Sequence, residues 1–309
     1  MHKLYYSFPE FIGLHFKGKV QKISLDAGFS CPNRDGSLGR GGCSYCNNLS
    51  FNPSYCSTKR SISEQLSEGK DFFAHKYPKM DYLAYFQSYT NTYDKLDRLI
   101  DLYEEALRFP GVKGLVIATR PDCLPEDLLD YLEQVAKRCF LLVELGVEST
   151  LDKTLKEIGR GHDYACSVKA IQNLSQRKIL CGAHIILGLP GESREEMLSH
   201  AWRLNSLPIN TLKLHQLQLI RGTRLEKLVS ENPGYVQLFD AESYARLLID
   251  FIERLRPDMV LDRFVSQAPA EWLIGPDWGM KNYEFSHKLE KMLRAGGHYQ
   301  GRQYSDSNA

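Results

Sequence analysis

The chain alternates short apolar runs with longer segments in which apolar residues recur every three or four positions. This alternation extends from residue 20 to about residue 265, and it is typical of repeated βα units. The short runs are apolar enough to be buried on both faces, which favours parallel strands. The predicted strands span residues 20–27, 81–87, 113–119, 140–147, 180–188 and 211–219.

Helix start signals lie between these strands. Ser61 and Glu64, for example, have the spacing of a capping box. Six βα units predict an α/β fold with a partial (βα)6 barrel of the TIM type, although a doubly wound open sheet has the same local pattern. We expect an N-terminal extension over residues 1–19, the core over residues 20–256, and a C-terminal extension over residues 257–309 with a disordered tail.

The composition places few further limits on the fold. Hydrophobic residues make up 43% of the 309 positions and charged residues 25%, as in ordinary globular proteins. No segment approaches the ~18–20 apolar residues that span a bilayer, and the N-terminus does not resemble a signal peptide. We therefore expect a cytoplasmic protein with no membrane partner. In that compartment the eight cysteines are not expected to form disulfides. A clustered subset is expected to bind metal or catalyse, and the scattered cysteines are expected to be small buried packing residues.

Three cysteines stand together directly after the first predicted strand. Cys31, Cys43 and Cys46 have the spacing C-x11-C-x2-C in a glycine-rich loop, and glycine lets the backbone pass close to a bulky group. Three thiolates can hold an iron–sulfur cubane and leave one iron for an outside ligand. A structural zinc site is the alternative, with Cys56 as fourth ligand, but such sites usually present two close cysteine pairs. The spacing therefore favours an iron–sulfur cluster.

The loop resembles that of the radical S-adenosylmethionine (radical SAM) superfamily. The usual spacing there is C-x3-C-x2-C, and the wider gap is similar to that of the Elongator catalytic subunit and related enzymes. Further motifs resemble the Elongator and oxygen-independent coproporphyrinogen oxidase-like branch: Gly-Val-Glu-Ser at 146–149, Gly-Arg-Gly-His at 159–162, Gly-Leu-Pro-Gly-Glu at 188–192 and Gly-Thr at 222–223. The whole chain is similar to the bacterial YhcC-like family within this branch.

The resemblance implies a set of cofactors. Cys31, Cys43 and Cys46 would hold a [4Fe–4S] cluster that S-adenosylmethionine completes, and cleavage of S-adenosylmethionine would give a 5′-deoxyadenosyl radical. The cofactors would supply the difficult chemistry, and the protein would supply orientation and exclusion of water. A reducing electron donor of the flavodoxin or ferredoxin type is the expected partner.

The resemblance also implies which residues contact S-adenosylmethionine. Tyr45 would lie beside the adenine, Glu148 on the ribose or amino group, and Arg160 near the methionyl carboxylate. His184 would face the nucleoside. The Gly-Gly-Glu motif that binds the methionyl amine in relatives is missing, and Gln87 stands in its place.

Three functions remain open. The resemblance to Elongator implies the first, a radical SAM enzyme that modifies RNA, with the wobble uridine of tRNA as the expected target. The alternatives are a radical SAM enzyme acting on a small metabolite or tetrapyrrole, and a non-catalytic zinc-binding nucleic-acid module. Residues 1–60 carry a net charge of +5, against +1 for the whole chain. We expect Arg34, Arg40, Lys59 and Arg60 to surround the mouth of the site, where they would attract RNA phosphates.

Overall fold

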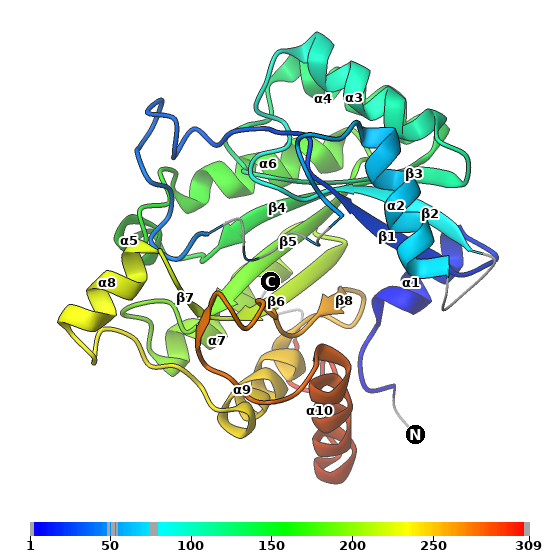
Figure 1. The fold of residues 1–309 in the computed structure, drawn as a ribbon. Helices are drawn as coiled ribbons and strands as arrows, with labels where there is room; N and C mark the ends of the chain where they lie inside the picture. The colour runs from blue at the N-terminus through cyan, green and yellow to red at the C-terminus, as the bar shows by residue number, and fades with distance from the viewer. Residues whose placement is uncertain (1–2, 48–49, 51–52, 54, 75–79, 306–309) are drawn as a thin grey trace.

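A parallel sheet curled into an open half-barrel is the centre of the molecule (Figure 1). The computed structural model describes residues 3–47, 50, 53, 55–74 and 80–305. The strand order is β1-β2-β3-β4-β5-β6-β8, so the chain adds each strand beside the previous one and the predicted partial barrel is confirmed. The strands are β1 (Val20–Leu25), β2 (Asp81–Phe86), β3 (Val112–Thr119), β4 (Phe140–Glu148), β5 (Leu180–Leu187), β6 (Thr211–Gln216) and β8 (Val260–Arg263).

Two features differ from the predicted strands. The strand β8 pairs with β6 and extends the sheet beyond the six expected strands. The predicted strand 211–219 breaks after Gln216, and its last part becomes β7 (Leu219–Ile220). This short strand pairs antiparallel with β9 (Leu273–Gly275). The segment after the sixth strand therefore leaves the barrel and forms a small second sheet.

Helices cover the outer face of the half-barrel (Figure 1). The predicted capping box begins α2, because Ser61 N donates to Glu64 at 2.7 Å and Glu64 N donates to the Ser61 hydroxyl at 3.2 Å. No helix in the described ranges is both long and apolar enough to cross a bilayer. The helices are α1 (Phe8–His15), α2 (Ile62–Ala74), α3 (Leu96–Arg108), α4 (Glu126–Arg138), α5 (Asp152–Glu157), α6 (Tyr164–Gln176), α7 (Arg194–Asn205), α8 (Arg224–Glu231), α9 (Ala241–Arg254) and α10 (Asn282–Gly296).

The interior of the half-barrel is apolar at one end and polar at the other. Phe11 and Ile12 of α1 pack against the inward-facing Leu83, Val116 and Leu142. Burial of this apolar surface stabilises the fold by roughly 25 cal/mol per Å². The same cluster includes the first residues of several strands. The helix α1 therefore fills the end at which the strands begin and leaves the opposite end for a site.

The C-terminal segment is ordered where it is described, so the predicted disorder is wrong for residues 297–305. Gln300 is 6% exposed. Its side chain accepts from Tyr6 N at 2.9 Å and donates to the Met259 carbonyl at 2.7 Å. These bonds satisfy buried backbone groups at both ends of the chain. The last part of the predicted disordered tail, residues 306–309, lies outside the described residues.

Candidate active site

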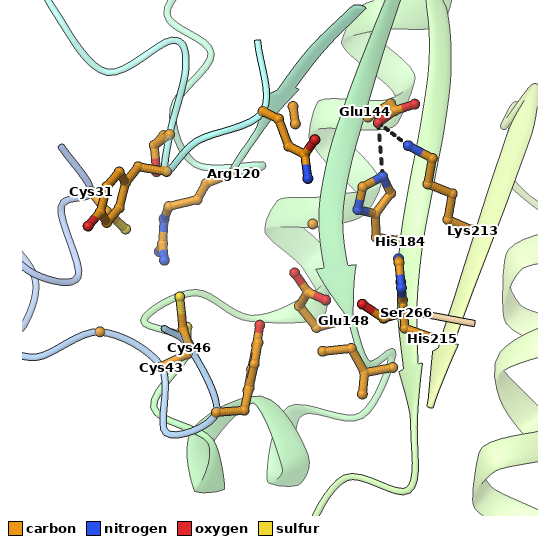
Figure 2. A pocket seen from close by; sticks show the side chains of 18 of the residues that line it. Cys31, Cys43, Cys46, Arg120, Glu144, Glu148, His184, Lys213, His215 and Ser266 are labelled. Carbon is orange, nitrogen blue, oxygen red and sulfur yellow. Dashed lines mark hydrogen bonds and ion pairs between the residues drawn. The ribbon is translucent and has the colours of Figure 1, made fainter. Parts of the chain in front are cut away.

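A cavity opens at the ends of the strands, where the active sites of βα barrels lie (Figure 2). Its walls come from the loop after β1 and from inward-facing residues of several strands. All the site residues predicted from the sequence line it: Cys31, Cys43, Tyr45, Cys46, Gln87, Glu148, Arg160 and His184. The fold therefore brings these residues together, and their individual contacts with a cofactor stay predictions.

The three cysteines of the loop face one space. Figure 2 shows Cys31 on one side and Cys43 with Cys46 on the other, and all three thiols are free. Burial and the neighbouring Cys43 raise the pKa of Cys46 to about 11. Among the described residues, no three His, Cys, Asp or Glu side chains lie close enough together to hold a metal ion.

The remaining cysteine of the zinc alternative lies elsewhere. The Cys56 thiol donates to the Ser24 carbonyl at 3.0 Å and packs against the hydrophobic core. Burial, together with the negative charge of Asp26, raises its pKa to about 12. Cys56 is therefore held by the backbone of Ser24 and is not among the described residues that line the cavity.

The loop is held in place by Asn33, which the sequence analysis missed. Its side-chain amide donates to the Gly159 carbonyl at 2.6 Å, and its own carbonyl accepts from Gly42 N at 2.8 Å. Gly42 has φ +83°, and a Cβ there would lie 2.9 Å from Arg34 Nε. The glycine is needed both for its backbone conformation and for this close approach. Asn33 thus joins the cysteine loop to the Gly-Arg-Gly-His motif.

Three arginines surround the cysteines. Arg34 and Arg120 line the cavity with Arg160, and Figure 2 shows Arg120 reaching toward the thiols. Arg160 is 7% exposed, and its Nη1 donates to Cys43 Sγ at 3.6 Å. Buried nitrogens of Arg120 (Nη1) and Arg160 (Nε) have no partner among the described residues. Since buried donors are normally paired, these cations and free N–H groups fit an anionic group, such as a thiolate-held cluster or a carboxylate.

Glu148 enters the cavity through a local irregularity of the sheet. The register of β4 against β5 shifts between Gly146 and Glu148, and Glu148 has φ +67°. Such strain costs about 1–3 kcal/mol and is concentrated at functional sites. A Cβ on Gly146 would lie 2.5 Å from Glu148 Oε1 and 2.7 Å from Arg160 Nη2. Gly146 therefore allows the carboxylate and the guanidinium to approach to 3.7 Å.

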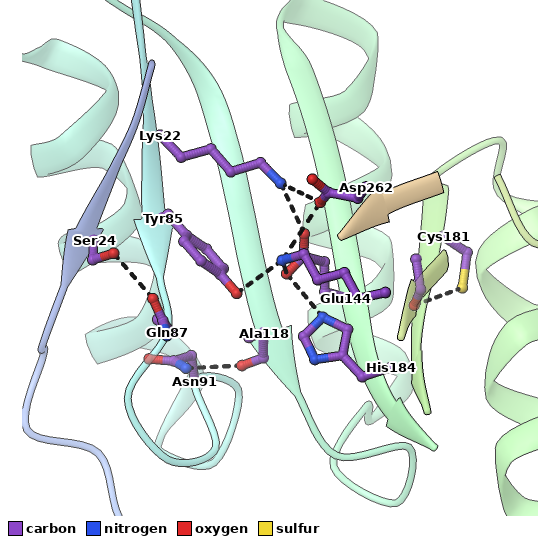
Figure 3. A network of polar contacts seen from close by, with 12 residues as sticks. Lys22, Ser24, Tyr85, Gln87, Asn91, Ala118, Glu144, Cys181, His184 and Asp262 are labelled. Atoms are coloured by element: carbon purple, nitrogen blue, oxygen red, sulfur yellow. Dashed lines mark hydrogen bonds and ion pairs between the residues drawn. The ribbon is translucent and has the colours of Figure 1, made fainter. Parts of the chain in front are cut away.

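Tyr45 and Gln87 lie on different walls. Tyr45 packs against the apolar cluster that contains Leu155 and Ile158. Burial, with the nearby charge of Glu148, raises the pKa of Tyr45 well above its usual value, so the side chain remains a neutral phenol. The Gln87 side-chain oxygen accepts from the Ser24 hydroxyl at 3.0 Å (Figure 3). Both side chains are thus fixed before any ligand enters.

At the far end of the cavity lies a network of charged side chains that no sequence motif predicts. Glu144 is 1% exposed. One of its oxygens accepts from Lys22 at 3.1 Å, and the other accepts from Lys213 at 2.6 Å and contacts His184 Nε2 at 3.1 Å (Figure 3). Lys22 also pairs with Asp262 at 2.7 Å. We call Lys22, Glu144, Lys213 and Asp262 the floor network.

The floor network joins the two edges of the half-barrel. Lys22 lies on β1 and Asp262 on β8, the first and last strands of the sheet. Burial opposes ionisation of Glu144, but Lys213 and Lys22 hold its pKa well below the usual range. Glu144 is therefore a carboxylate at neutral pH. Each member lies on a separate strand, so no local sequence motif indicates the network.

Only some of the basic side chains expected around the mouth of the cavity line it. Arg34 lines the cavity, and its guanidinium lies 5.7 Å from the centre of the Tyr89 ring. Arg60 instead forms an ion pair with Glu68 of α2 at 2.6 Å. Lys59 and Arg60 are not among the described residues that line the cavity.

Comparison with known proteins identifies the family. The chain matches the Radical SAM superfamily over residues 36–201 and the Radical_SAM C-terminal domain over residues 209–295. The chain belongs to the radical SAM superfamily. It is an enzyme of that superfamily, and the alternative of a non-catalytic zinc-binding module is set aside. The family implies a [4Fe–4S] cluster and S-adenosylmethionine.

The relatives confirm the predicted branch. The uncharacterized protein YtqA of Bacillus subtilis is 35% identical over 300 residues, covering 97% of this chain and 92% of YtqA. Protein YhcC of Escherichia coli is 34% identical over 298 residues, covering 96% of this chain and 94% of YhcC. A tRNA uridine(34) acetyltransferase of Methanocaldococcus infernus is 31% identical over 119 residues, covering 37% of this chain and 22% of that protein.

A solved structure shows the same fold. The archaeal Elp3 of Methanocaldococcus infernus, with an N-terminal deletion, superposes with a TM-score of 0.68 at 17% identity. The match covers 92% of this chain and 64% of that chain. The half-barrel is therefore the radical SAM fold, as predicted from the sequence.

Proposed function

We propose that Cys31, Cys43 and Cys46 hold a [4Fe–4S] cluster and that the enzyme modifies RNA, with the wobble uridine of tRNA as its target. One observation carries the cofactor assignment: three free thiols, three arginines and Glu148 line a single cavity at the ends of the strands. When bound, the cluster supplies the electron that cleaves S-adenosylmethionine and releases a 5′-deoxyadenosyl radical. A flavodoxin or ferredoxin type of protein would donate that electron.

The residues of the chain would bind and orient S-adenosylmethionine. The Arg160 guanidinium suits the methionyl carboxylate, because a bidentate pair is both strong and directional. The Glu148 carboxylate accepts hydrogen bonds from an amine or a ribose hydroxyl. Tyr45 covers one side of the site from its apolar cluster and would exclude water from the adenine. Gln87 and His184 line the remaining walls.

The RNA substrate is supported by one relative and by the mouth of the cavity. The relative from Methanocaldococcus infernus is named a tRNA uridine(34) acetyltransferase, although it shares only part of this chain. At the mouth, Tyr89 is 36% exposed and lies beside the Arg34 guanidinium. Aromatic rings and guanidinium planes stack with unpaired bases. This pair offers such a surface where an RNA base would enter.

The test is mass spectrometry of tRNA nucleosides from a strain that lacks the gene. We expect one modified uridine to disappear and its precursor to accumulate. Wild-type protein should restore the modification, and the Cys46→Ala protein should not. An unchanged nucleoside profile would contradict the RNA assignment and would favour the small-molecule alternative.

A further inference from the structure

Two imidazoles lie side by side at the end of the cavity farthest from the cysteines. His184 is on β5 and His215 on β6, and their ring centres are 5.5 Å apart. Both line the cavity (Figure 2). No hydrogen bond joins the His215 ring to another described residue, so its ring nitrogens are available to a ligand.

The floor network fixes the orientation of His184. Nε2 lies 3.1 Å from Glu144 Oε2. Because Glu144 is a carboxylate that only accepts, Nε2 must carry the hydrogen. Glu144 also accepts from Lys22 and Lys213. In the neutral tautomer with its hydrogen on Nε2, Nδ1 is an acceptor, and Figure 2 shows it turned away from Glu144 toward the open part of the cavity.

The lysines of the floor network have their partners within the protein. Lys213 Nζ contacts Glu144 at 2.6 Å, Asp262 at 3.5 Å and the Tyr85 hydroxyl at 3.2 Å. Lys22 contacts the same two carboxylates. These cations therefore hold the carboxylates in place, and the two imidazoles are the neighbouring groups that remain available to a ligand.

His215 complements His184 chemically. Burial lowers the pKa of His215 well below its usual value. The ring is thus neutral at physiological pH and carries one N–H donor. An acceptor of fixed orientation on His184 lies next to a donor on His215. Their spacing allows one small planar group to contact both rings.

We propose that His184 and His215 form a substrate-recognition pair for a planar imide edge, the N–H beside a carbonyl found in uracil-type bases. His184 Nδ1 accepts from the base N3–H, and the His215 N–H donates to the adjacent carbonyl oxygen. This assignment deepens the proposed function, since it rests on an RNA substrate and names the edge of the base that is recognised. It assigns His184 to the substrate, in place of the contact with S-adenosylmethionine that the family resemblance implies.

The first test uses the cluster-loaded full-length protein with S-adenosylmethionine present. The probes are synthetic anticodon stem–loop RNAs that differ at one base: uridine, N3-methyluridine or cytidine. The wild type should bind the uridine RNA at least about 10-fold more tightly than the other two, because a buried acceptor left unpaired is costly. His184→Gln keeps a donor near Glu144 but removes the acceptor at the Nδ1 position, so this discrimination should disappear.

A matched variant separates recognition from structure. His184→Asn places an amide oxygen close to the Nδ1 position and should retain part of the preference for uridine. Nitrogen-15 NMR of the imidazoles should show the Nε2–H tautomer for His184, with its Nδ1 resonance shifting when uridine RNA or free uridine monophosphate binds. A solely structural histidine would show no such shift.

The outcomes distinguish this inference from the proposed function. Equal binding of uridine and N3-methyluridine RNA by the wild type would overturn the imide assignment and leave the RNA substrate intact. Loss of S-adenosylmethionine affinity in His184→Gln, with base preference unchanged, would assign His184 to the cofactor instead. If no RNA binds but uridine monophosphate shifts Nδ1, the pair stands and the RNA proposal fails. If neither ligand has an effect, both fail.

Discussion

The two ends of the cavity are built in different ways. At the cysteine end, one loop supplies Cys31, Cys43 and Cys46, and Asn33 and three arginines hold and surround it. At the floor, each strand contributes a single residue, and the carboxylate of Glu144 joins them. The first end is a local arrangement on a loop that contains glycines, whereas the second is part of the sheet itself.

Because of this difference, we expect changes at the cysteine end to affect cluster binding and changes at the floor to affect the stability of the fold. Removing a ligand from the loop should abolish cluster binding and leave the barrel intact, because the loop lies beyond the hydrophobic core. Removing a charge from the floor should destabilise the whole fold, because the remaining charges then lose one of their partners in the interior. The predictions below test this contrast.

The largest expected effect is at the cysteine end. Replacing any one of Cys31, Cys43 or Cys46 with Ala should abolish the cluster, since each thiolate is one of the three protein ligands that we propose. Anaerobic reconstitution of the wild type should give about four iron and four sulfide per chain, whereas each variant should give almost none. Circular dichroism should show an unchanged fold.

Cys56→Ala is the matched control, and it should keep the full iron content. Equal loss of metal in Cys56→Ala, with zinc bound to the wild type, would contradict the iron–sulfur assignment. Unfolding of the Cys43→Ala protein would instead contradict the contrast between the two ends.

The next largest effect is at the floor. Glu144→Gln leaves Lys22 and Lys213 to share Asp262 as their remaining carboxylate partner, and breaking a buried ion pair costs about 3–5 kcal/mol. The free energy of unfolding, measured by urea denaturation, should fall by this amount. The control is Glu104→Gln, whose ion pair with Arg138 lies partly in solvent and contributes only about 0–1 kcal/mol. Equal losses in the two variants would show that the floor network does not stabilise the fold.

The floor should also show a characteristic pH dependence. The lysines hold the pKa of Glu144 below its unfolded value, which is about 4.3. The stability contributed by ionised Glu144 is then fully present above that value and is lost as the pH falls through the folded pKa. The difference in unfolding free energy between wild type and Glu144→Gln should therefore shrink as the pH is lowered below about 4.3. A constant difference over this range would contradict the ion-pair origin.

The smallest effect concerns Arg160. A lysine keeps the charge but cannot reproduce the bidentate geometry of a guanidinium. Arg160→Lys should retain cluster and fold, and its affinity for S-adenosylmethionine should fall about 10-fold, equivalent to roughly 1.4 kcal/mol. Isothermal titration calorimetry measures this directly. Unchanged affinity would mean that Arg160 serves only its contacts with the Gly146 carbonyl and Cys43.

The sequence predicts what is local in the chain. Apolar runs located the first six strands, and the cysteine spacing with the Gly-Val-Glu-Ser motif located residues that line the cavity. Asn33 carries no motif of its own, because its importance comes from a bond to Gly159. The four members of the floor network are separated by many residues, so only the strand register brings them together.

Two other features that the sequence does not predict also depend on contacts between distant parts of the chain. The segment of β8 is an apolar run in an expected extension, and only its pairing with β6 shows that it belongs to the sheet. The segment after α10 is polar and rich in glycine, as disordered tails are. The order of this segment depends on Gln300. Its buried side chain accepts from Tyr6 N and donates to the carbonyls of Arg256 and Met259.

The bonds of Gln300 have a consequence for how the protein is made. Tyr6 is synthesised early, whereas Gln300, whose side chain accepts from Tyr6 N, follows all the strands of the half-barrel. Because chains are synthesised from the N-terminus, Phe11 and Ile12 of α1 can pack against Leu83, Val116 and Leu142 of the nascent sheet before this bond forms. We therefore expect the segment after α10 to dock onto a half-barrel whose apolar end α1 already covers.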